Sequence, residues 1–224
     1  MLSDEECRFL SERMKISVSH VEEKLSEVFL SGYRAGIEEF VSFCVKAIRT
    51  CQLDVLADSQ LVSGSHEVVE RINKCAIFLQ GRICDQGARD ILDAFRHAFR
   101  LYALGGLHDL WVYQENEMWY PKIILDCELK PNCINLLPGE IVIYRGASIS
   151  EWEVSRYGQS WSTEEAVARR FAYQSYEHMP WFKREERVVF RTTVNKSLVF
   201  YACQAPEYEV VVDSTKIGCV ELLS

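Results

Sequence analysis

Polar and charged side chains stand at the ends of three short apolar runs in the C-terminal half of this 224-residue chain. The runs are 141–146, which contains Arg145, 161–164, which contains two hydroxyls, and 207–212, which begins with two glutamates. Apolar, β-branched runs of this length favour strands. A guanidinium, a hydroxyl pair and paired carboxylates that converge from three strands can bind a dinucleotide and stabilise a developing sugar cation.

The third run supplies the predicted catalytic carboxylates. Glu209 opens an apolar strand, so its backbone is expected to be held rigidly while its side chain faces a cleft. Glu207 lies two residues earlier, and in an extended chain residues i and i+2 point to the same face. Both carboxylates are therefore expected to reach one site. The alternative is that both are solvent-facing charges at the start of a strand.

The first run supplies a cation. Arg145 follows three apolar residues and precedes Gly146, which lets a backbone turn at the end of a strand. The planar guanidinium suits phosphate oxygens. The alternative is a structural salt bridge between Arg145 and either Glu151 or Glu153.

The second run supplies hydroxyls before a predicted helix. Ser162 and Thr163 precede two glutamates, and Ser162 with Glu165 fits a capping box. Capping does not exclude a second role, because a serine at the end of a strand can also support a catalytic glutamate through a hydrogen bond.

The order of Arg145, Ser162 and Glu209 resembles the arginine–serine–glutamate signature of mono-ADP-ribosyltransferases of the cholera-toxin-like class, which use NAD. The resemblance spans residues 140–213 and includes the Glu-Ala-x-Ala-x-x-Phe-Ala pattern at 165–172. The family usually has Ser-Thr-Ser where this chain has Ser-Thr-Glu, so any role of the third hydroxyl is not carried over.

The resemblance implies an α+β fold with a strand-rich ADP-ribosyltransferase-like core and assigns roles to the site residues. Glu209 would bind the ribose 2′-hydroxyl and Glu207 would activate the acceptor, while NAD, as co-substrate, would be held by Arg145, Gly146, Ser162 and Thr163. It further implies an intracellular toxin or effector restrained by an inhibitor or antitoxin. The alternatives are an NAD glycohydrolase, with water as acceptor, and a non-catalytic ligand-binding or interaction module.

The acceptor is expected to be a macromolecule. A Glu-x-Glu pair resembles the arginine-modifying branch, which slightly favours a protein arginine side chain. Residues 169–191, however, interleave aromatic and basic side chains, a composition suited to stacking on bases and following phosphates. An exocyclic amine of an RNA or DNA base is therefore close behind, with Tyr176, Trp181 and Arg184 as candidate acceptor-binding residues.

Composition argues against several other classes of function and location. The net charge of −8 argues against a nucleic-acid binder that uses its whole surface. The nine cysteines form no Cys-x-x-Cys pair and the five histidines show no ligand spacing, so no metal is expected. The acidic N-terminus is unlike a secretory signal, and the apolar stretches are too short for a bilayer. These features predict a cytoplasmic protein without membrane contact.

Periodicity predicts helices first and strands later. Helices are expected at 3–21, 37–48, 66–79, 90–104 and after Trp161, with the pair Gly105-Gly106 ending the fourth. Strands are expected at 122–125, 140–144, 187–194, 197–201, 209–212 and 218–222. The predicted division is an N-terminal helical region at 1–106 and a catalytic region at 107–224.

Overall fold

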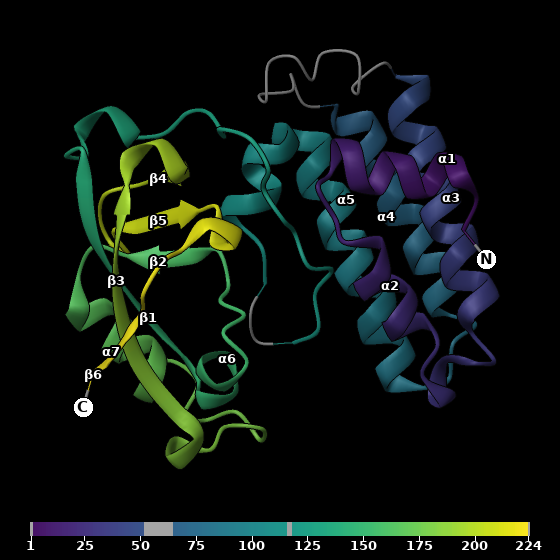
Figure 1. Ribbon diagram of the computed structural model, residues 1–224. Coiled ribbons are helices and arrows are strands. Elements are labelled where there is room, and N and C mark those ends of the chain that lie inside the picture. The colour runs from purple at the N-terminus through teal and green to yellow at the C-terminus, as the bar shows by residue number, and fades with distance from the viewer. Residues whose placement is uncertain (1, 52–64, 116–117, 224) are drawn as a thin grey trace. The chain divides into compact units, whose positions relative to one another are not determined.

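The computed structural model describes residues 2–51, 65–115 and 118–223 and confirms an α+β chain in which helices precede a sheet (Figure 1). The chain forms two compact units, 1–124 and 125–224. This division falls later than the predicted boundary after residue 106, because the last long helix continues to Val112. Among the described residues, no helix combines the length and the apolar character needed to span a bilayer.

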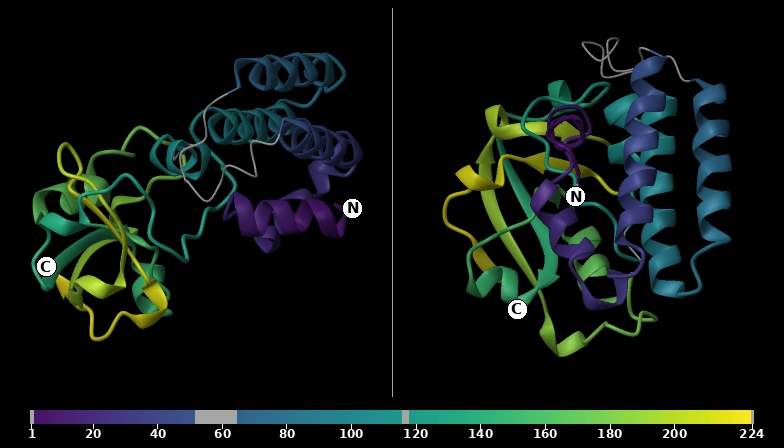
Figure 2. Two further views of the ribbon diagram at one scale, coloured as in Figure 1. Left: turned by 90° about the horizontal axis from the view of Figure 1, so that it is seen from above. Right: turned by 90° about the vertical axis from the view of Figure 1, so that its right-hand side faces the viewer.

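The first unit consists of helices whose apolar faces pack together. The long helices α3 (Arg34–Thr50), α4 (His66–Gln80) and α5 (Gln86–Val112) lie side by side (Figure 2). Serine or aspartate caps begin α4 and α5, since Ser65 accepts from the amide of Val68 and Asp85 from that of Ala88. The predicted stripes are buried, and Ile37, Phe40, Ile72 and Phe95 are among the residues with 0% exposure.

The first predicted helix is interrupted. Ser3 and Glu6 form the expected capping box of α1 (Asp4–Arg8), which continues as a π-helical turn (Phe9–Arg13). The backbone then leaves the helical region at Lys15, whose φ is 55°, before α2 (Val18–Leu25) begins. Ile16, in this break, pairs with Ile123, and this single bridge takes the place of the strand predicted at 122–125.

Gly105 and Gly106 kink α5 instead of ending it. Gly106 has a φ of 67° and a ψ of −151°, a combination that only glycine adopts without strain, and the helix resumes after it. The predicted stop was therefore wrong because Leu107, Leu110 and Trp111 bury apolar surface beyond the kink.

The second unit contains one six-stranded antiparallel sheet in the order β4-β5-β2-β1-β3-β6. Its strands are β1 (Glu140–Ser148), β2 (Ser160–Ser162), β3 (Arg187–Asn195), β4 (Val199–Ala202), β5 (Glu209–Val212) and β6 (Glu221–Leu223). Two helices interrupt them, α6 (Ile149–Glu153) and α7 (Glu165–Tyr173). β5 has the predicted bounds, whereas β1 continues four residues beyond the predicted end at 144, to Ser148.

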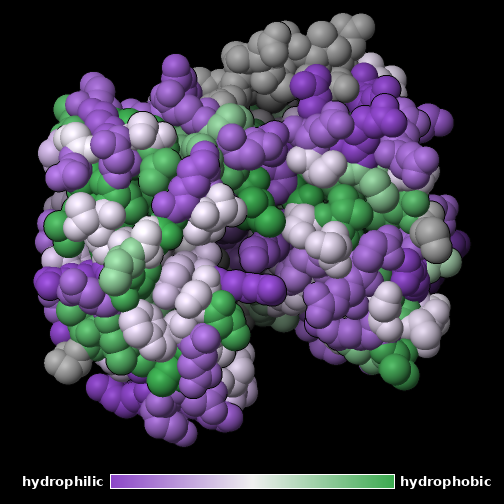
Figure 3. Space-filling model, viewed as in Figure 1, coloured by the Kyte–Doolittle hydropathy of each residue, from purple (hydrophilic) through white to green (hydrophobic). Residues whose placement is uncertain are grey.

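The two faces of this sheet are covered differently. One face carries an aromatic and aliphatic core that includes Ile143, Trp161, Phe190 and Val210. The other face packs against α7 through Ala168 and Ala172. The outer surface mixes hydrophilic and hydrophobic side chains on the face that Figure 3 displays.

Gly146 lies inside β1 and permits the close approach of α7. A Cβ at this position would lie 2.6 Å from the Ala172 amide nitrogen and closer still to the Ala168 carbonyl oxygen. The glycine predicted to turn the chain at the end of a strand is therefore needed for helix–sheet packing, and β1 runs straight through it.

Candidate functional site

Glu209 opens β5 and is held by a serine of the neighbouring strand. The Ser160 hydroxyl donates to Glu209 Oε1 at 2.6 Å. Ser160 stands directly opposite Val211, two residues along β5 from Glu209, so the bond runs diagonally between two strands. A carboxylate fixed between paired strands keeps one orientation, which is what electrostatic stabilisation of a cation requires.

Ser162 stands directly opposite Glu209 in the ladder but bonds elsewhere. Its buried hydroxyl donates to the backbone carbonyl of Glu207 at 2.8 Å and accepts from the amide of Glu164 at 3.1 Å. The N-cap of α7 is Glu164, without a side-chain bond, so the predicted capping box of Ser162 and Glu165 does not form. Ser162 instead ties the start of α7 to the turn before β5.

Thr163 extends the pairing of β2 with the chain before β5. Its amide donates to the carbonyl of Tyr208 at 3.0 Å. Thr163 therefore lies beside the predicted site and is held there by its backbone.

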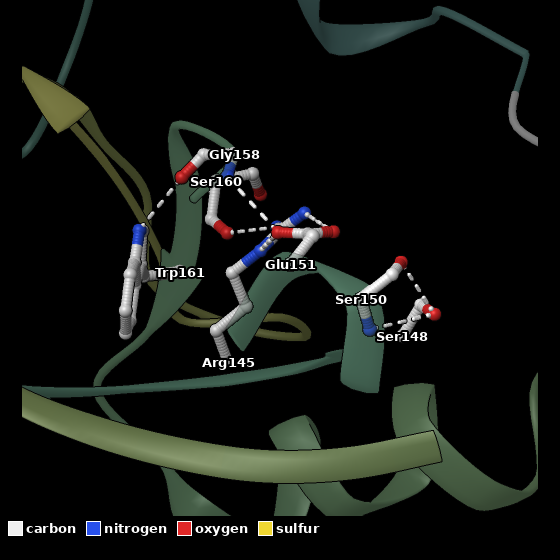
Figure 4. A network of polar contacts seen from close by, with 7 residues as sticks. All are labelled: Arg145, Ser148, Ser150, Glu151, Gly158, Ser160 and Trp161. Atoms are coloured by element: carbon white, nitrogen blue, oxygen red, sulfur yellow. Dashed lines mark hydrogen bonds and ion pairs between the residues drawn. The ribbon is translucent and has the colours of Figure 1, made fainter. Parts of the chain in front are cut away.

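Arg145 forms the salt bridge that the sequence left as an alternative. Its Nε and Nη2 donate to the two carboxylate oxygens of Glu151 at 2.9 and 3.0 Å, and its Nη1 donates to the Ser160 carbonyl at 2.6 Å (Figure 4). The amide of Gly158 also donates to Glu151, at 3.1 Å. Three of the five guanidinium N–H groups are used in these bonds.

The Arg145–Glu151 pair is largely shielded from solvent, with side-chain exposures of 20% and 27%. Burial by itself would raise the pKa of Glu151, but the charge and hydrogen bonds of Arg145 and the Gly158 amide together lower it. Glu151 is therefore ionised at neutral pH and fixes the guanidinium. The predicted second partner, Glu153, is exposed on α6.

Arg145 and Glu209 occupy opposite faces of the sheet. Directly opposed residues share a face, and the ladders place Tyr144, Ser162 and Glu209 in one row. Arg145 pairs with Phe190, on the face of the aromatic core. The guanidinium and the carboxylate therefore do not share a face, and Ser160 joins the two groups: its carbonyl accepts from Arg145 and its hydroxyl donates to Glu209.

Glu207 lies in a turn and not in an extended run with Glu209. Tyr208, between them, has a φ of 49°, and its amide donates to the Gln204 carbonyl at 2.8 Å. Glu207 and Glu209 are therefore not placed on one face by the alternation of an extended strand. Glu207 is exposed, and the bond from Ser162 to its carbonyl fixes its backbone beside β2.

The predicted acceptor-binding residues follow α7. The rings of Tyr176 and Trp181 lie 5.4 Å apart, and the Arg184 guanidinium lies 5.2 Å from the ring centre of Tyr173. Trp181 is 50% exposed. The segment therefore presents one accessible indole supported by a second ring, while the cation of Arg184 contacts Tyr173.

Ser160 is the site residue that the sequence reasoning missed. Its signal was its spacing, because Ser160 and Ser162 flank the apolar Trp161 and alternate with it, as residues of one strand face do. Among the described residues no cluster of histidine, cysteine or carboxylate side chains has the geometry of a metal site.

Comparison of the chain with models of protein families, with curated proteins and with solved structures found no match.

Proposed function

We propose that the chain is an NAD-dependent mono-ADP-ribosyltransferase that uses Glu209 as its catalytic carboxylate. The observation that carries the proposal is the pair of hydrogen bonds made by Ser160, which joins the Arg145 guanidinium to the Glu209 carboxylate through one residue. The resemblance of the Arg145, Ser162 and Glu209 order to the arginine–serine–glutamate signature supplies the reaction class.

In the proposed reaction the bond between nicotinamide and ribose breaks, and its electron pair leaves with nicotinamide. Positive charge develops on the sugar, and the Glu209 carboxylate stabilises that charge. The acceptor nitrogen then bonds to the sugar carbon and releases a proton, which Glu207 accepts. The exposure of Glu207, in the turn directly before β5, suits a group that meets a macromolecular acceptor.

Arg145 has two tasks in this proposal. Its bonds to Glu151 and to the Ser160 carbonyl hold the start of β2, and so the Ser160 hydroxyl, in place. Three of the five guanidinium N–H groups donate to Glu151 and to the Ser160 carbonyl. The other two can donate to a phosphate of NAD without breaking the pair with Glu151.

The acceptor we favour is a protein arginine side chain, on the resemblance of the Glu-x-Glu pair to the arginine-modifying branch. A base of RNA or DNA is the second candidate, which the half-exposed Trp181 beside Tyr176 supports, because an accessible indole can stack on an unpaired base. The intracellular toxin or effector role, with an inhibitor or antitoxin as partner, is part of the same proposal.

Incubation of the protein with a cell lysate and NAD labelled in its adenylate portion tests the proposal. We expect release of nicotinamide and transfer of label to macromolecules. Label removed by protease but not by nuclease identifies a protein acceptor, and the reverse identifies a nucleic acid. Nicotinamide release without macromolecular label identifies an NAD glycohydrolase, and the absence of both contradicts any NAD-cleaving function.

A further inference from the structure

Three buried polar atoms of the first unit lack a hydrogen-bond partner among the described residues, and the charge of Arg100 acts on both of the other two groups. They are His97 Nδ1, Arg100 Nε and the Tyr120 hydroxyl. His97 and Arg100 are three residues apart on α5, so they share a face of the helix. Tyr120 packs against that face, with its ring 6.0 Å from the His97 ring at an angle of 72°. Buried polar atoms without partners are rare in proteins and call for a ligand, an ion or a water.

The neighbouring carboxylates do not supply the hydrogen bonds that these three atoms lack. Asp93, one turn from His97, is bonded to Arg96 at 2.7 Å. The Glu115 carboxylate lies 3.1 Å from His97 Nδ1 but outside hydrogen-bond geometry, and its side chain is 48% exposed. Among the described residues, no carboxylate forms an ion pair with Arg100. The cluster therefore retains the positive charge of a guanidinium next to two other polar groups.

The protonation states of the three groups determine which of them donate and which accept hydrogen bonds. Burial lowers the pKa of His97, which the charge of Glu115 partly opposes, so the ring is neutral at pH 7. Burial raises the pKa of Tyr120, and the charge of Glu115 adds to that effect, so the phenol keeps its proton. Arg100 Nε and the Tyr120 hydroxyl are therefore donors, while neutral His97 can donate or accept at Nδ1.

We propose that His97, Arg100 and Tyr120 form a binding site for a small oxyanion, namely the phosphate or carboxylate group of a small molecule. Two donors and one guanidinium charge match an acceptor that carries negative charge and several oxygens. A water molecule satisfies the hydroxyl but does not neutralise the guanidinium, which forms no ion pair with a carboxylate in the described part of the chain. The site lies within the first unit and does not depend on the function proposed for the second.

Calorimetric titration of the full chain tests the proposal, with sodium phosphate in one arm and sodium acetate in the other. Sodium chloride holds the ionic strength constant, and the arm with the tighter binding identifies the preferred group. We expect saturable binding in at least one arm. Arg100→Gln and Tyr120→Phe should each weaken it about tenfold, because each removes a donor to an anion. Tyr113→Phe, which alters a tyrosine that is 58% exposed, is the control and should leave binding unchanged.

Two further results separate an anion site from a buried water. Glu115→Gln should tighten oxyanion binding, because it removes a negative charge beside the site. Tyr120→Phe should raise the melting temperature in chloride, where its hydroxyl lacks a partner, and lower it relative to the parent in saturating phosphate or acetate. The proposal is overturned if neither anion binds saturably, or if Tyr120→Phe lowers the melting temperature equally in all three salts.

Discussion

At the residue scale, Ser160 explains how groups on two faces of a sheet can act together. Its side chain contacts Glu209 on one side, and its backbone carbonyl contacts Arg145 on the other. Glu151 and the Gly158 amide fix Arg145 in turn. The proposed chemistry therefore rests on a chain of hydrogen bonds that ends at one carboxylate.

Replacing Ser160 by alanine should lower kcat for nicotinamide release about tenfold or more and leave the KM for NAD nearly unchanged. The substitution removes the hydroxyl that positions Glu209 but keeps the carboxylate itself and the contact between Arg145 and the backbone carbonyl of residue 160. The effect is therefore expected on the chemical step and not on NAD binding. Steady-state kinetics on the folded variant measure both constants. Ser162→Ala is the matched comparison, because that hydroxyl bonds to the Glu207 carbonyl and not to Glu209. Equal loss of kcat in both variants would show that Ser160 has no special part in positioning Glu209.

The salt bridge between Arg145 and Glu151 should make the stability of the second unit depend on pH. The native pKa of Glu151 lies below its usual 4.5, so the unfolded chain binds more protons in the acidic range. The contribution is fully present above pH 4.5 and is lost as the pH falls through the native pKa. Glu151→Gln should cost about 1–3 kcal/mol of unfolding free energy at neutral pH and less in acid. Denaturant unfolding at about pH 7 and about pH 3.5 measures this, and a cost that is the same at both would contradict it.

At the element scale, the contact between α7 and β1 positions the end of β2 from which the helix starts. Gly146→Ala should destabilise the second unit by about 1–3 kcal/mol, because its methyl group meets the backbone of α7, which can move only as a whole. Gly139→Ala is the control, since nothing lies within 4 Å of a Cβ at that position. Thermal unfolding monitored by circular dichroism compares the two. A Gly146→Ala protein as stable as Gly139→Ala would show that α7 does not pack on β1 in this way.

The segment after α7 should contribute to binding of the acceptor and not to cleavage of NAD. If the acceptor is a nucleic acid, Trp181→Ala should reduce its modification by about tenfold, because a stacked base is worth about 1–3 kcal/mol. Nicotinamide release in the absence of acceptor should be unchanged. Parallel assays of label transfer and of nicotinamide release measure the two effects. Equal losses in both assays would count against a base-stacking role and would place Trp181 in NAD binding.

The positions of the helices and strands could be predicted from the sequence better than the pairing register of the strands. The apolar spacing of α3, α4 and α5 and the β-branched run of β5 are local patterns, and the sequence alone predicts them. The face on which Arg145 lies depends on which β1 residue stands opposite Ser162, and that pairing is set by the whole sheet. The role of Gly146 likewise depends on a helix that begins about twenty residues later, and the turn at Tyr208 depends on a positive φ that tyrosine seldom adopts.

At the scale of the whole molecule, each unit buries its own core. The first unit packs helices around residues such as Phe40 and Phe95, and the second packs its sheet around residues such as Trp161 and Phe190. The proposed catalytic carboxylate, its serine and its arginine all belong to the second unit, whereas the proposed oxyanion site belongs to the first. The two proposals can therefore fail separately.

The central claim is that Glu209 stabilises the sugar cation formed when NAD is cleaved. The most direct test compares nicotinamide release from NAD by the parent protein and by Glu209→Gln, with circular dichroism to establish that the variant is folded. The amide is nearly isosteric but neutral, so release should fall by about 100-fold or more. Glu207→Gln is the matched comparison and should retain release while losing transfer to the acceptor. Release at the parental rate from a folded Glu209→Gln protein would contradict the account.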